Sequence, residues 1–174
     1  KSRYDEVFRP MRSDLVCNTL GAIGLAAGCV MGMQSGGTAV LVIGLLGLCG
    51  ALALLAGGVF RMKKTAPSCL FYVPAIFYYV CKLFYDFRRW MHDPAILDYC
   101  FCLFALICFM IATYHAASFS FDRGGRRRLC FYSLCGVFFG ASAMAGQPLS
   151  GMLIYGASAC VCLAYAMQAL GTGK

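Results

Sequence analysis

Six long apolar stretches, separated by short polar or charged segments, constrain this chain more strongly than any other feature of its sequence. Each stretch is close to the roughly 20 residues that an α-helix needs to cross a lipid bilayer. Lipid offers the backbone no hydrogen-bond partners, so such a segment is stable there as a helix, whose hydrogen bonds are internal. We therefore predict an all-α polytopic membrane protein with six transmembrane helices in one compact bundle. The expected spans are residues 15–34, 39–60, 67–87, 94–119, 129–146 and 150–171.

The composition supports one membrane domain over residues 15–171, preceded by a polar segment over residues 1–14. Hydrophobic residues make up 61% of the 174 residues and charged residues 13%, whereas soluble domains carry about 25% charged residues. The net charge of +8 gathers at the ends of the apolar stretches and does not form the basic stripe that is typical of nucleic-acid binding. We therefore exclude nucleic acid and expect a lipid bilayer, including anionic lipids, as the first partner.

The distribution of basic residues predicts the orientation of the chain. Every Lys and Arg except Lys82, Arg88 and Arg89 lies in the first segment, in the last residue or in alternate connections between the apolar stretches. Cytoplasmic loops of membrane proteins carry an excess of Lys and Arg, which is the positive-inside rule. We therefore expect both termini and residues 1–14 in the cytoplasm, in a multi-pass protein of a cell membrane, taken here as a bacterial plasma membrane.

The first apolar stretch carries a glycine ladder in which glycines recur at every fourth position. Residues four apart share one face of a helix, and small residues on that face let two helices approach closely in lipid. This glycine zipper predicts tight packing against another helix, either in this chain or in a partner. Its members are Gly24, Gly28, Gly32 and Gly36.

Ionisable residues enter the third apolar stretch near its predicted outer end. Lys82 and Asp86 are four residues apart and can pair on one helical face. Charged residues within a span are costly and usually face the bundle interior, so by default they indicate a functional site. The alternative is a structural pair in which Lys82 extends its stem to water at the membrane boundary. The candidate ligand-binding residues are Tyr79, Lys82, Asp86, Arg89 and Asp98.

A cluster of arginines precedes the fifth apolar stretch: Arg123, Arg126, Arg127 and Arg128. Arginines at a cytoplasmic boundary bind anionic lipid headgroups at about 1 kcal/mol each. We expect this cluster to set the topology and to contact lipid, with docking of a partner protein as the alternative.

The chain is rich in cysteine, but its twelve cysteines lie within or beside the apolar stretches. No C-x-x-C motif occurs, and two cysteines separated by one residue point to opposite sides of a helix. We interpret these residues as small hydrophobic side chains and expect no metal and no other cofactor. The single glutamate, Glu6, excludes a metalloprotease of the H-E-x-x-H type. No recognisable catalytic motif occurs, so the sequence gives no support to an enzyme but does not exclude one.

Three functional hypotheses follow from these patterns. The first is a solute-binding or transport component, with its site near the outer ends of the third and fourth helices. It would bind a small-molecule solute and work with an energising membrane partner. The second is a non-catalytic assembly or interaction subunit, a homo-oligomer included, that packs through the glycine-rich first helix. The third is an intramembrane enzyme or redox protein.

Overall fold

The computed structural model describes residue 8 and residues 12–34, 37–62, 67–91, 99–121 and 123–171, which form helices and no strand. Two single-turn 3₁₀ helices, η1 (Cys69–Phe71) and η3 (Phe119–Phe121), precede α4 and follow α5. The long helices are α2 (Arg12–Gln34), α3 (Thr38–Met62), α4 (Val73–Trp90), α5 (Cys100–Ser118), α6 (Arg126–Ala143) and α7 (Leu149–Leu170).

Five helical segments in the described residues are long and apolar enough to cross a membrane: Ser13–Gln34, Thr38–Arg61, Cys69–Trp90, Cys100–Phe121 and Leu149–Leu170. Helix α6 is not among them, because three arginines occupy its first turn and only 15 residues follow within the helix. The prediction of an all-helical, multi-pass membrane protein is confirmed at this level.

Several helix ends differ by a few residues from the approximate spans expected from the sequence. The third span was expected to end at residue 87, but α4 continues to Trp90, so Arg88 and Arg89 belong to the helix and not to a turn. The fifth span was expected to run to residue 146, but α6 ends at Ala143. Gly146 there has a φ of 77°, a left-handed conformation that favours glycine and reverses the chain. The predicted start of the fourth span, residue 94, lies outside the described residues.

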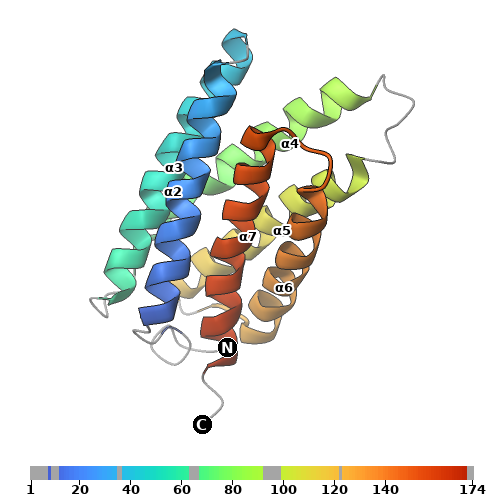
Figure 1. Ribbon diagram of the computed structural model, residues 1–174. Helices are drawn as coiled ribbons and strands as arrows, with labels where there is room; N and C mark the ends of the chain where they lie inside the picture. Colours follow the sequence, from blue (N-terminus) through green and yellow to red (C-terminus); the bar gives the residue numbers. More distant parts are fainter. Residues whose placement is uncertain are drawn as a thin grey trace.

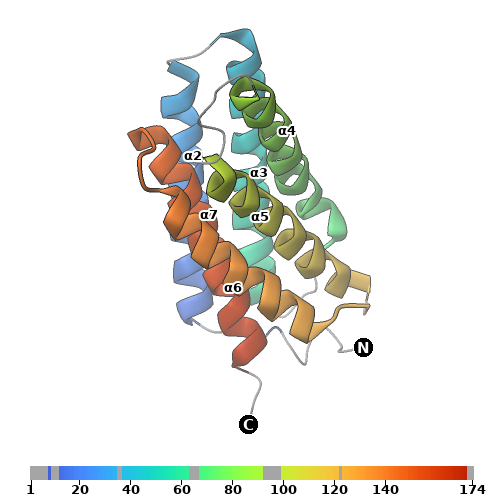
Figure 2. The ribbon, with the colours of Figure 1, turned by 90° about the vertical axis from the view of Figure 1, so that its right-hand side faces the viewer.

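The six helices form a closed ring in which each helix packs against its neighbours in sequence and α7 packs against α2. Figures 1 and 2 show α2, α3 and α7 running alongside one another, with α4 crossing at a larger tilt. Large aromatic side chains fill the interior, including Tyr78, Tyr79, Phe109 and Tyr165, each at most 1% exposed. Large apolar side chains also cover the outer surface, as expected where the surrounding solvent is lipid.

The start of α2 and the end of α7 lie at the same end of the ring (Figure 1). The start of α6, with its arginines, lies there too, and we call this the basic end. The opposite end, where α2 and α4 finish and α7 begins, is called the far end.

Part of the glycine ladder explains how closely α2 approaches α7. A Cβ atom at Gly24 would lie 3.0 Å from the Cβ of Ala157, and one at Gly28 would lie 2.8 Å from the Ile154 side chain. A Cβ at Gly32 would meet no atom within 4 Å, and Gly36 lies outside the described residues. An added Cβ would therefore be crowded by α7 at Gly24 and Gly28, whereas at Gly32 it would have space.

Candidate functional site

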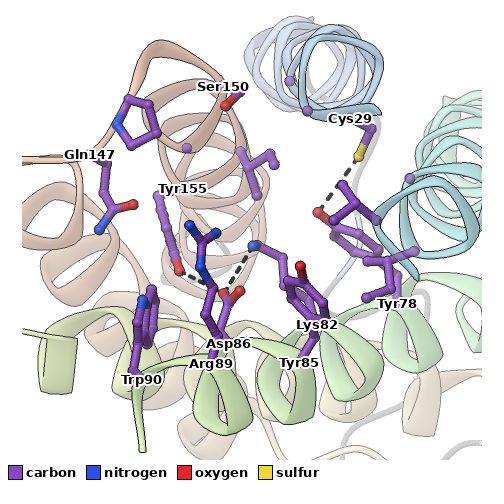
Figure 3. Close-up of a pocket in the computed structure, with 18 of the residues that line it drawn as sticks. Cys29, Tyr78, Lys82, Tyr85, Asp86, Arg89, Trp90, Gln147, Ser150 and Tyr155 are labelled. Atoms are coloured by element: carbon purple, nitrogen blue, oxygen red, sulfur yellow. Dashed lines mark hydrogen bonds and ion pairs between the residues drawn. The ribbon is translucent and has the colours of Figure 1, made fainter. Parts of the chain in front are cut away.

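A cavity of about 540 Å³ opens between α2, α3, α4 and α7 at the far end. Figure 3 looks into it, with α4 carrying most of the large polar side chains. We call it the far-end cavity. Its polar and aromatic lining side chains are Cys29, Tyr78, Lys82, Tyr85, Asp86, Arg89, Trp90, Gln147, Ser150 and Tyr155.

The cavity exists because small residues face large ones across it. Its α2 and α3 walls include Gly28, Gly32, Gly37 and Gly44. A Cβ atom at Gly32 or Gly37 would meet no atom within 4 Å, so these two positions border open space. Because Gly32 and Gly37 carry no side chains, the long side chains of α4 have room to extend into the gap between the helices.

An ion pair forms the polar centre of the cavity. The Nζ atom of Lys82 lies 2.9 Å from Oδ2 of Asp86, the i, i+4 pairing that the sequence predicts. Across the cavity, the Tyr155 hydroxyl of α7 donates a hydrogen bond of 3.4 Å to the same carboxylate oxygen. Asp86 is only 5% exposed, so its charge is neutralised inside the protein.

Arg89 lies one helical turn beyond this pair and also lines the cavity. Its side chain is exposed, and it forms no ion pair with any residue that the structure describes. Figure 3 shows its guanidinium projecting from α4 into the same space as the Lys82 amine. Among the described lining residues, the charges of Lys82, Asp86 and Arg89 therefore leave one positive charge in excess.

Aromatic and neutral polar groups complete the lining. Trp90 stacks on Tyr99 with ring centroids 4.4 Å apart and an angle of 7° between the rings, which links the end of α4 to the start of α5. The Cys29 thiol donates to the Tyr78 hydroxyl over 3.6 Å. Gln147, in the turn before α7, donates to the sulfur of Cys102 over 3.5 Å. The site thus combines flat apolar surfaces with a few convergent polar groups, as small-molecule pockets do.

The structure brings three of the five predicted ligand-binding residues together in this cavity: Lys82, Asp86 and Arg89. Tyr79 does not line it. Its hydroxyl is buried in the core and donates to Ser158 of α7 over 3.1 Å, so it links α4 to α7. Asp98 lies outside the described residues.

The sequence reasoning missed the cavity residues contributed by other helices. Gln147, Ser150 and Tyr155 lie more than 60 positions from Lys82, and no local spacing connects them to it. Trp90 was detectable, since it is the only tryptophan of the chain and directly follows Arg89.

A second polar cluster lies buried near the basic end. Arg61 of α3 lies 3.5 Å from the carboxylate of Asp14 and donates to the Asn18 side chain over 2.9 Å. Asn18 in turn donates to the Leu54 carbonyl over 2.9 Å. The Arg61 guanidinium also lies 5.3 Å from the ring centroid of Tyr165. Arg61 was expected to be a boundary charge, but it is 4% exposed, because Asp14 and Asn18 supply partners for it inside the bundle.

The arginine cluster divides into two kinds of residue. Arg126 donates from Nε to the Ala169 carbonyl over 2.5 Å and so engages the last turn of α7. Arg123, Arg127 and Arg128 are exposed at the basic end. These three arginines remain the candidates for contact with lipid headgroups or a partner.

The cysteines form no disulfide among the residues that the structure describes, and no group of three or more potential metal ligands gathers within the described ranges. Comparison of the chain with models of protein families, with curated proteins and with solved structures found no match.

Proposed function

We propose that this chain is a solute-binding component of a membrane transport system and that the solute binds in the far-end cavity. The observation that carries the proposal is the cluster of Lys82, Asp86 and Arg89 lining one open cavity within an apolar helix bundle. Charged side chains at such positions are costly and usually mark substrate or ion pathways. The volume of about 540 Å³ also lies in the range of known small-molecule sites.

The proposal includes an orientation in which all six long helices cross the membrane and both termini are cytoplasmic. In support, α2 begins and α7 ends at the basic end (Figure 1), where Arg123, Arg127 and Arg128 are exposed. Helix α6 would then keep its arginines at the cytoplasmic boundary, where such side chains reach water and headgroups. The far-end cavity would open to the outside of a cell membrane, which we take to be a bacterial plasma membrane.

Transport also needs a partner or a gradient to drive it. The three exposed arginines are the proposed contacts for anionic lipids or for an energising protein, because they lie together at one boundary and carry like charge. The alternative of an assembly subunit has less support, since Gly24 and Gly28 already pack against α7. No observation favours an intramembrane enzyme or redox protein.

A cavity-filling variant tests the proposal. Gly32→Phe adds a large side chain where the cavity wall borders open space. Gly57→Phe is the matched control, because a Cβ there also meets no atom within 4 Å but Gly57 does not line the cavity. Each protein is purified in nanodiscs and incubated with a cell extract, and the retained small molecules are identified by mass spectrometry.

We expect the wild type and Gly57→Phe to retain the same solute, and Gly32→Phe to lose it while eluting as a folded protein. Equal retention by all three proteins, or no solute retained by the wild type, would contradict the proposal.

A further inference from the structure

We infer that the solute of the far-end cavity is a small organic carboxylate and that its carboxylate binds the guanidinium of Arg89. This inference rests on the proposed function and adds the chemical class of the ligand. The first supporting observation is the charge of the lining residues that the structure describes. Lys82 and Asp86 neutralise each other at 2.9 Å, whereas Arg89 has no ion-pair partner among the described residues.

The geometry around Arg89 suits an anion. A guanidinium presents its N–H groups as a planar fork that matches the two oxygens of a carboxylate. Figure 3 shows the Arg89 guanidinium and the Lys82 amine directed into one space, so a bound carboxylate would lie near both positive groups.

The start of α7 adds to the positive potential of the cavity. Its N-cap residue, Pro148, makes no side-chain capping hydrogen bond, and both Ser150 and Gly151 line the cavity. The first N–H groups of a helix have no intrahelical acceptor and carry a partial positive charge. This end of α7 therefore favours an anion in the same space as Arg89.

The remaining lining indicates an organic solute and not an inorganic ion. Trp90, Tyr85 and Tyr155 present aromatic rings to a cavity of about 540 Å³, far larger than one ion needs. The single excess positive charge of the described lining balances one negative charge, which matches a carboxylate better than a phosphate monoester carrying a charge of about −1.5 to −2. The lining thus fits an apolar or aromatic body that carries one carboxylate.

Trp90 makes the inference directly measurable, because it is the only tryptophan of the chain and lines the cavity. The full chain in phosphatidylcholine nanodiscs is titrated with three probes that share a phenyl body: phenylacetate, neutral phenylacetamide and cationic phenethylamine. Trp90 fluorescence reports binding. We expect a saturable change with phenylacetate at a concentration at least about tenfold lower than with the other two probes, since a hydrogen bond to a charged group contributes about 1.5–3 kcal/mol.

Three single variants test whether the preference comes from Arg89 or from the general positive charge of the surface. Arg89→Gln is expected to remove the preference for phenylacetate, whereas Arg89→Lys is expected to retain part of it. Arg88→Gln is the control, because Arg88 is an exposed arginine on the same helix that does not line the cavity, and it is expected to leave the preference unchanged.

Equal or tighter binding of the amine or the amide, or an unchanged preference in Arg89→Gln, would overturn the carboxylate assignment and leave solute binding intact. No response to any of the three probes would also overturn it. The retention experiment with Gly32→Phe would then test the proposed function separately.

Discussion

At the scale of single residues, the charges of the far-end cavity divide into those that pair with each other and those that can bind a ligand. The charges of Lys82 and Asp86 lie on one turn of α4, 2.9 Å apart, and Tyr155 of α7 contacts the same carboxylate. The pair therefore has a structural role that does not depend on any ligand. Arg89, one turn further along, has no such role in the described structure, which is why the ligand is assigned to it.

Removing one member of the pair is expected to destabilise the protein more than removing both. Asp86→Asn leaves the Lys82 ammonium without its counter-charge, at a cost of about 1–3 kcal/mol. The double variant Lys82→Met with Asp86→Asn removes the unpaired charge and should recover most of this loss. Thermal unfolding of the purified variants measures both effects. A double variant less stable than Asp86→Asn alone would show that Lys82 stabilises the fold through contacts other than Asp86.

At the scale of helices, the contact between α2 and α7 closes the ring, and it depends on the absence of side chains. At Gly28 a Cβ would lie 3.0 Å from the carbonyl oxygen of Ser150 as well as 2.8 Å from Ile154. The backbone of α7 cannot move aside as a flexible side chain can. Four residues on, Gly32 of the same helix borders the cavity, and a Cβ there would meet no atom within 4 Å.

Gly28→Leu is therefore expected to destabilise the protein, because the added side chain must push α2 and α7 apart, and overpacking of this kind costs about 1–3 kcal/mol. Gly32→Leu is the matched control and should leave the unfolding temperature nearly unchanged. Fluorescence-detected gel filtration after a heating series compares the two. If Gly28→Leu were as stable as Gly32→Leu, the α2–α7 contact would not limit stability.

At the scale of the whole molecule, the two ends of the ring differ in charge and in how they are closed. The basic end carries exposed arginines and, inside the bundle, the buried Asp14–Arg61 pair. The far end opens into the cavity. This asymmetry is what a component that takes a solute from one side requires. It also makes the proposed orientation testable with a protease.

Trypsin is expected to cut after Arg123, in the described residues between α5 and α6, in inside-out vesicles but not in right-side-out vesicles. The reason is that the basic end should face the cytoplasm. The fragment that begins at Gly124 identifies the cut by mass spectrometry, and detergent-treated vesicles of both kinds serve as the positive control. Protection in inside-out vesicles with cleavage in right-side-out vesicles would reverse the orientation.

The sequence alone predicted the features that depend on local spacing. Runs of apolar residues near the thickness of a bilayer determine that the chain is helical and crosses a membrane several times. The i, i+4 separation of Lys82 and Asp86 determined their pairing, because one helical turn brings them together whatever the rest of the chain does. Helix ends were less predictable, as Arg88 and Arg89 show, since charged residues can extend an apolar helix past the lipid.

Only the tertiary structure decided which helices contact one another. These contacts determine which residues form the site. The packing of α7 on α2 brings Tyr155 to Asp86 and the start of α7 to Arg89, over separations that no periodicity encodes. The packing of α3 on α2 places Arg61 beside Asp14, where the sequence indicated a boundary charge. Helix periodicity determines which face a residue occupies, but the partner of that face depends on how all six helices fit together.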